Sequence, residues 1–93
     1  ALYKQSDVAI QIVEMSTNEP FPFHSHPSTE IMVVISGRMI VVFDEDYRID
    51  LGPTDVVTIE PNRLHGAEIP EDTRIIAITI PADADYPAPK VGG

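Results

Sequence analysis

Apolar residues are grouped along the chain in short runs that prolines and turn residues separate. Val8 to Met15 alternates between apolar and polar as a half-buried strand does, and runs rich in Val and Ile cover 31–35, 39–43, 56–59 and 75–80. Nine prolines divide the chain into pieces too short for ordinary helices, and helical spacing of the apolar residues is absent. The pattern therefore predicts an all-β protein.

Turn residues lie between several of these runs. Ser36-Gly37 separates two apolar runs, and Asp44-Glu45-Asp46 is predicted to close a hairpin between 39–43 and 47–50. Gly52-Pro53 starts a further turn. Short strands with frequent turns and no intervening helix favour an antiparallel sandwich or a small barrel.

The length of 93 residues leaves room for one hydrophobic core. We expect a single domain over residues 1–80 and an extended tail over 81–93, where prolines and a terminal Gly pair occur. No basic segment followed by an apolar stretch opens the sequence, and no apolar run approaches the roughly 18 to 20 residues of a membrane helix. The expected location is the cytoplasm, with no membrane partner.

Charge and composition restrict the possible partners. Fifteen acidic residues against six basic ones give a formal net charge of −9, which repels nucleic acid. Cysteine is absent, which excludes disulfides, thiolate ligands and a cysteine nucleophile. We therefore expect a small-molecule partner and no nucleic acid.

Several runs are apolar at successive positions, so both faces of the sheet are predicted to be covered. The cover is either a second sheet or a partner chain. Val33 and Ile35 face away from Glu30 by alternation, and the run over 75–80 is equally two-sided. A homodimer is the expected assembly, unless the N-terminal strand covers this face from within the chain.

All three histidines, together with one glutamate, form a pattern with metal-binding chemistry. His24-Ser25-His26 places two imidazoles on one side of an extended segment, Glu30 follows, and His65 comes after the turn at Pro61. Three imidazoles and one carboxylate suit a divalent transition metal of intermediate softness. Histidines in a Pro-rich loop are more often surface residues, and Glu30 could mark a solvated strand start. Alternation instead puts that carboxylate on an interior face, where it needs a positive partner.

This spacing resembles the first motif of the cupin family: Gly, five residues, His-x-His, three or four residues, Glu, six residues, Gly. His24, His26, Glu30 and Gly37 occupy the matching positions, and Asn18 stands at the first Gly. Asn is the non-glycine residue that best tolerates positive φ, so this replacement is physically mild.

The second cupin motif is matched more loosely. Gly52 opens it and His65 closes it, while Asn62 stands where the turn Gly is expected. The stretch between Gly52 and the turn is longer than in the motif, and the motif's trailing Asn is absent. Together the two motifs cover residues 18–65.

The resemblance implies an antiparallel β-barrel of six to eight strands, a jelly roll or double-stranded β-helix. It also implies that one divalent transition metal is bound by His24, His26, Glu30 and His65. Such a shell with two open positions fits an octahedral ion, which favours Fe, Mn or Ni over Zn, Co or Cu.

Alternation around these ligands predicts which other side chains line a pocket. The candidates are Phe23, Met32, Val34, Met39, Val41, Ala67 and Ile69. Most are apolar, and for each of them a place in the barrel core is the commoner alternative. Arg38 and Arg63 are the arginines nearest the motifs, and either could contact an anionic substrate or lie exposed on a hairpin.

Two functions are compatible with these features. The first is a metal-dependent enzyme, such as a dioxygenase, isomerase or lyase, acting on a small oxygen-rich substrate that is chelating or anionic and binds at the open metal positions. The second is a non-catalytic module that binds or senses a metal or small molecule. No general acid or base beyond the ligands is evident, so the catalytic residues are unknown.

Overall fold

A computed structural model describes residues 3–4, 7–17, 21–44 and 46–81 of the chain. All of its regular elements are strands, which confirms the all-β prediction. They are β1 (Tyr3–Lys4), β2 (Ala9–Met15), β3 (Phe21–His24), β4 (Thr29–Asp44), β5 (Tyr47–Leu51), β6 (Val56–Ile59) and β7 (His65–Ile80). None of the described residues forms a helix that could cross a membrane.

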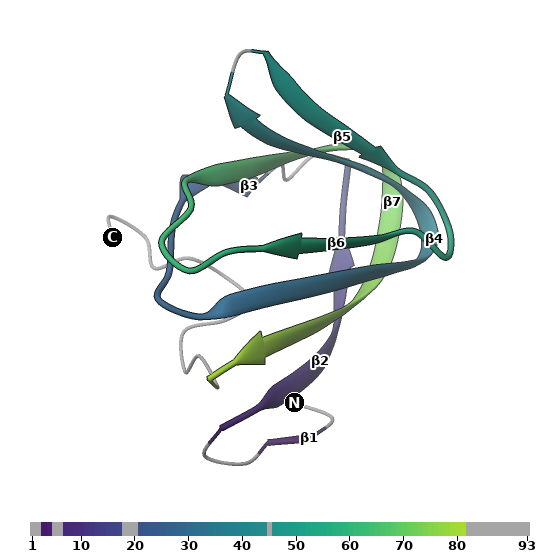
Figure 1. The fold of residues 1–93 in the computed structure, drawn as a ribbon. Coiled ribbons are helices and arrows are strands. Elements are labelled where there is room, and N and C mark those ends of the chain that lie inside the picture. Colours follow the sequence, from purple (N-terminus) through teal and green to yellow (C-terminus); the bar gives the residue numbers. More distant parts are fainter. Residues whose placement is uncertain (1–2, 5–6, 18–20, 45, 82–93) are drawn as a thin grey trace.

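The seven strands form one antiparallel sheet around two long members, β4 and β7. The path through the sheet is β1-β2-β7-β4-β5, with β3 also paired to β7 and β6 also paired to β4. Both long strands bend, so each contributes to both halves of a curled sheet (Figure 1). No pairing between described residues joins the two ends of the path, so the sheet is curled without being closed.

The interior of the curl holds the hydrophobic core. Along the first half of β4, Glu30, Met32 and Val34 are buried while Ile31 and Val33 are only partly covered, as alternation predicts. The core consists of Val13, Met15, Met32, Val34, Met39, Val41, Phe43, Leu51, Val57, Ile59, Ile69, Ile75 and Ala77. Alternation therefore places Glu30 inside this apolar region.

The prediction of a turn at Ser36-Gly37 is wrong, because β4 continues through both residues. Its pairing with β7 shifts register around Ser36, and Gly37 has a φ of 86°. A Cβ on Gly37 would lie 2.2 Å from the Asp72 carbonyl oxygen. The pairing is irregular on both sides of Ser36, so the strand continues through an irregular segment instead of ending, and Gly is required at 37 because the neighbouring strand approaches too closely for a side chain.

The other two turns are where the sequence predicts them. β4 and β5 form a hairpin, and the Asp46 amide donates to Asp44 Oδ1 over 2.9 Å; Glu45 lies outside the described residues. After β5, the Asp55 amide donates to the Gly52 carbonyl over 3.0 Å, and the Gly52 amide donates to Asp55 Oδ2 over 2.8 Å. Residues 82–93 of the expected tail are not described.

The outward side of the sheet is also apolar over four adjacent strands. Ile12 on β2 pairs with Ile76 on β7, which pairs with Val33 on β4, which pairs with Val56 on β6. We call the set the outer apolar face; it comprises Ile10, Ile12, Ile31, Val33, Val56, Ile76 and Ile78. No described strand packs over it, and Ile12 and Val56 are 48% and 56% exposed.

Candidate metal centre

The three histidines, far apart in sequence, meet at one end of the curled sheet. His24, the last residue of β3, pairs with His65, the first residue of β7, and their ring centroids are 4.5 Å apart. His26 lies in the loop before β4, with its ring 5.6 Å from that of His24 and 5.3 Å from that of His65. One ring nitrogen from each histidine lies within 4.8 Å of the others.

A bulge in β3 turns His24 toward the interior. Phe21 pairs with Ala67 and His24 pairs with His65, so β3 has one more residue between these pairs than β7 has. In a regular strand Phe21 and Phe23 would share a face, but the extra residue lets Phe21 and His24 share it. The bulge therefore selects which β3 side chains reach the site.

The turn before β7 connects the His65 and His26 segments. Asn62 has a φ of 63°, as expected for a residue standing in place of a turn glycine. Its amide donates to the His26 carbonyl over 2.7 Å. This backbone bond holds the two histidine segments together. Asn18, the other replacement of a motif glycine, lies outside the described residues.

Backbone carbonyls orient all three imidazoles in the same way. Nδ1 of His24 and of His65 donates to the carbonyl two residues earlier, over 2.8 and 2.7 Å. Nδ1 of His26 donates to the carbonyl two residues later, over 3.3 Å. A carbonyl can only accept, so each Nδ1 carries a hydrogen, and in a neutral ring Nε2 is left with its lone pair. This anchoring is typical of metal-binding histidines.

Glu30 supplies a buried carboxylate to the same place. Its side chain is 2% exposed, and Oε1 lies 3.1 Å from His26 Nε2 and 3.3 Å from His65 Nε2. Because both rings already hold a hydrogen on Nδ1, each contact requires either an imidazolium or a cation shared between the oxygen and the nitrogen. One divalent ion would satisfy both contacts, so this donor set fits a transition metal.

The electrostatics of His24 favour the neutral ring. Burial is the largest influence and lowers the pKa of His24, while the hydrogen bond to the Pro22 carbonyl opposes the shift. The nearby rings of His65 and His26 lower the pKa further. Neutral imidazole is the form that binds metals, so the lowered pKa favours the ligating form of His24.

A small cavity adjoins the histidines on the interior side. Its walls are Met15, Phe21, His24, Glu30, Met32, Met39, His65, Gly66 and Ala67. About 10 Å³ of space remains in it, which is near the minimum for a single water. A substrate must therefore approach from the solvent side, where His24 is partly exposed.

The expected pocket residues divide into three groups. Met32, Met39 and Ala67 line the cavity, whereas Val34, Val41 and Ile69 are buried in the core outside its walls. Phe23 differs from the expectation, since it is 50% exposed and does not line the cavity. The walls that sequence reasoning missed are Met15, Phe21 and Gly66. For Phe21 the missing information was the β3 bulge.

The two arginines nearest the motifs have different surroundings. Arg38 binds Asp50 through two guanidinium nitrogens on the exposed surface, and this hydrogen bond lowers the pKa of Asp50. The Arg63 guanidinium carbon instead lies 4.5 Å from the ring centroid of Phe43 and 5.9 Å from that of Tyr47. Because the Phe43 ring centroid lies 6.4 Å from that of His65, Arg63 lies near the histidines.

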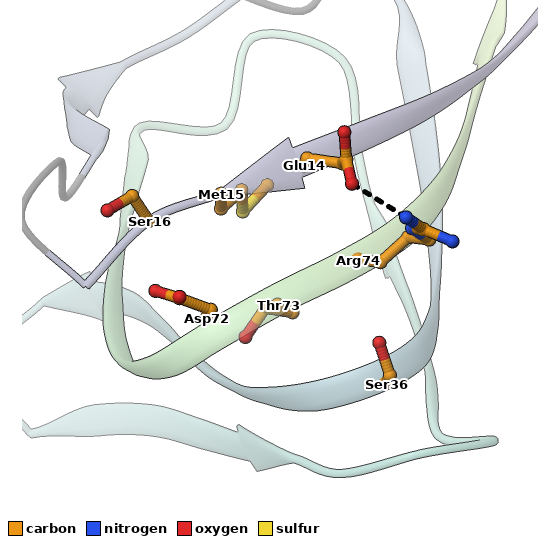
Figure 2. A pocket seen from close by; sticks show the side chains of 7 residues that line it. All are labelled: Glu14, Met15, Ser16, Ser36, Asp72, Thr73 and Arg74. Atoms are coloured by element: carbon orange, nitrogen blue, oxygen red, sulfur yellow. Dashed lines mark hydrogen bonds and ion pairs between the residues drawn. The ribbon is translucent and has the colours of Figure 1, made fainter.

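A larger hollow of about 320 Å³ lies away from the histidines, at the end of β2 (Figure 2). Its walls are Glu14, Met15, Ser16, Ser36, Asp72, Thr73 and Arg74. Glu14 and Arg74, which are paired on neighbouring strands, form an ion pair at one end of it over 2.7 Å. The hollow is open and its single arginine is already paired with Glu14, so the smaller cavity with its convergent donors is the stronger functional candidate despite its size.

Comparisons with known proteins agree with this fold. The family model of the cupin domain matches residues 11–81. Acireductone dioxygenase from Exiguobacterium sibiricum is 28% identical, over 61% of this chain and 34% of that protein, so the chain spans about a third of its relative.

Solved structures are similar across most of the chain. An RmlC-like cupin from Shewanella frigidimarina has a TM-score of 0.79 and 21% identity, covering 87% of this chain and 72% of that one. A cupin superfamily protein from Desulfitobacterium hafniense has a TM-score of 0.77 and 20% identity, covering 86% of this chain and 72% of that one. At these identities the likeness concerns the fold alone.

Proposed function

The chain belongs to the cupin family, and on that basis we propose that it binds one divalent transition metal through His24, His26, Glu30 and His65. The observation that carries this proposal is the shared orientation of the rings: each Nδ1 is held by a backbone carbonyl, and Nε2 of His26 and of His65 lies beside the buried Glu30 carboxylate. Imidazole and carboxylate donors of this kind suit divalent transition metals.

The proposed metal is Fe, Mn or Ni, with Zn, Co or Cu as less favoured occupants. Three imidazoles and one carboxylate fill four positions, and an octahedral ion keeps two for exogenous ligands. The absence of thiolate ligands removes the donors that would select a closed tetrahedral zinc site.

We further propose an enzyme that acts on a small, oxygen-rich substrate, with dioxygenase, isomerase and lyase chemistry as the candidate classes. The similarity to an acireductone dioxygenase supports the first of these. A bound divalent ion would supply Lewis acidity toward the oxygen atoms of such a substrate. The chain's own contribution is positional: carbonyls fix the rings, and the methionine-lined wall limits water on the interior side.

A binding or sensing module is the second candidate. Apart from Glu30 and His65, the buried polar residues that the structure describes are Ser28, Thr73 and Thr79. None of these three is an ordinary acid or base at neutral pH. A site without a separate proton-transfer group is compatible with a ligand that is held and not converted.

Elemental analysis of the purified protein tests the metal proposal. We expect about one equivalent of a divalent transition metal in the wild type and a loss of stoichiometric binding in His65→Ala and Glu30→Gln, with a folded sheet by circular dichroism. Glu68→Gln is the matched control, because Glu68 is an exposed carboxylate paired with Arg48. Wild-type metal content in both site variants would overturn the ligand assignment.

Turnover separates the two candidate functions. The metal-loaded protein is assayed for oxygen uptake and for conversion of diols, keto acids and uronates. Activity that is lost in His65→Ala supports an enzyme. Stoichiometric metal without activity on any of these substrates supports the binding module.

We also propose that the protein is a homodimer that buries the outer apolar face against a second copy. The paired rows of Ile and Val run across four strands in register, which is the form of a surface that packs on another sheet. Apolar patches of this extent mark interaction sites more often than free surface. Sedimentation at micromolar concentration that finds only a 10 kDa species would contradict the dimer.

A further inference from the structure

Each of the four arginines contacts a carboxylate, three of them closely and Arg63 at a longer distance. The pairs are Arg38 with Asp50, Arg48 with Glu68 and Arg74 with Glu14. Arg63 has a contact of 3.5 Å to Glu60, whose side chain is 75% exposed. In a chain of net charge −9, a guanidinium with such a weak partner is an uncommon positive group.

Arg63 is held close to the candidate metal centre by aromatic rings. Its guanidinium carbon lies 4.5 Å from the Phe43 centroid, and the Phe43 centroid lies 6.4 Å from the His65 centroid. The guanidinium and the imidazole are therefore separated by no more than the sum of these two distances. A molecule of a few carbon atoms spans such a gap.

The stacked position leaves the guanidinium able to bind an anion. Attraction to the faces of Phe43 and Tyr47 places the charge without using the N–H groups in the guanidinium plane. Those groups form a planar fork that matches a carboxylate with two parallel hydrogen bonds. Because stacking already limits the side-chain rotamers, less entropy is lost when the anion binds.

We propose that Arg63 binds the distal carboxylate of a small dicarboxylic acid whose other end, an α-hydroxy or α-keto acid group, occupies the open metal positions. This inference rests on the proposed metal site, since the chelating end needs the ion. It makes Arg63 a specificity-determining residue. The remaining acidic surface repels such a dianion, so the ion and Arg63 together define where it binds.

The test compares L-malate with L-lactate on the metal-loaded protein by calorimetric titration. The two acids share the α-hydroxy acid head, and only malate has a second carboxylate. Wild type is expected to bind malate about tenfold more tightly, the size of one good hydrogen-bonded ion pair that is partly exposed. In Arg63→Gln the preference falls to within about twofold while lactate affinity and metal content stay unchanged, because the Arg63 carbonyl that holds His65 remains.

Two further variants exclude simpler explanations. Arg48→Gln removes the same charge from an outward pair with Glu68, so it keeps the malate preference if the effect is local. Arg63→Lys keeps the positive charge but lacks the planar pair of N–H donors, so its preference for malate over lactate is expected to lie between those of the wild type and Arg63→Gln. Thermal unfolding of each variant checks that loss of the Phe43 stacking has not unfolded the site.

The outcomes distinguish this inference from the proposed function. If the wild type binds no metal, both fail. If metal is bound but wild type shows no malate preference, or Arg63→Gln retains it, the role of Arg63 is overturned while the metal centre stands. Equal loss of preference in Arg48→Gln would also overturn it, since net charge would then be the cause.

Discussion

Replacing Gly37 with Ala tests how the irregular segment of β4 is held. Gly37 has a φ of 86°, and an added Cβ would lie 2.2 Å from the Asp72 carbonyl oxygen and 2.7 Å from two atoms of Thr73. All three atoms belong to β7, and two of them are backbone atoms that cannot rotate away. The strands therefore have to separate at this point.

The expected cost has two parts. A left-handed conformation costs an alanine about 1–2 kcal/mol relative to its preferred regions. Separation of the strands also weakens the bond from the Arg38 amide to Thr73 Oγ1, which is 3.0 Å long and contributes about 0.5–1.5 kcal/mol. We expect Gly37→Ala to lower the free energy of unfolding by about 1.5–3.5 kcal/mol, a large share of the total for a domain of this size.

Urea unfolding followed by circular dichroism measures this difference, with two matched glycine variants beside it. In Gly52→Ala the added Cβ meets its nearest atom at 3.9 Å, so stability should change by less than about 0.5 kcal/mol. The loss of unfolding free energy in Gly66→Ala should lie between those of the other two variants, because its Cβ would meet the Phe21 carbonyl oxygen and the movable Phe23 ring, each at 3.1 Å. If Gly37→Ala and Gly52→Ala unfold at the same midpoint, the close approach of β4 and β7 is not as described.

Three other predictions concern the surface and the site. Ile12→Lys should convert the proposed dimer to a monomer in sedimentation, whereas Leu64→Lys, which is also exposed but outside the outer apolar face, should leave the assembly unchanged. The Arg38 hydrogen bond lowers the pKa of Asp50 in the folded protein. The pair therefore stabilises the fold at pH values above the pKa that Asp50 has in the unfolded chain, and this contribution is lost as the pH falls through the lowered pKa of the folded protein. Asp50→Asn should thus lower the melting temperature slightly at pH 7, an effect that shrinks in acid and in high salt. Chelation should lower the melting temperature of metal-loaded protein, by an amount equivalent to about 2.7 kcal/mol if the free metal had been at 100 times its Kd.

Periodicity predicted the strands and the inward face correctly because burial follows alternation in a regular strand. Glu30, Met32 and Val34 are buried together for this reason. The same rule failed where the register shifts. A glycine between two apolar runs, such as Gly37, is compatible in sequence with either a turn or a bulge. Which of the two forms depends on the pairing with the neighbouring strand, which the local sequence does not specify. In β3, one extra residue brought Phe21 inward in place of Phe23.

For the candidate site, spacing identified the residues but not their orientation. The motif spacing singled out all three histidines, and the structure brings them within 4.8 Å. The carbonyls that fix each Nδ1 depend on local backbone conformation, which residue types alone do not specify. The different surroundings of Arg38 and Arg63 could not be predicted either: both lie close to the motifs in the sequence, but only tertiary packing places Arg63 over Phe43.

The pairing of His24 with His65 has a consequence for how the protein assembles. Both residues lie at strand ends that meet only when β3 docks against the start of β7, and Glu30 lies on β4, which pairs with the far half of β7. Contacts between such distant segments form slowly, because a long loop must close before they contribute. The donor set is thus complete only after the last long strand has been synthesised and docked. Metal uptake should accompany the final phase of refolding, not the initial collapse.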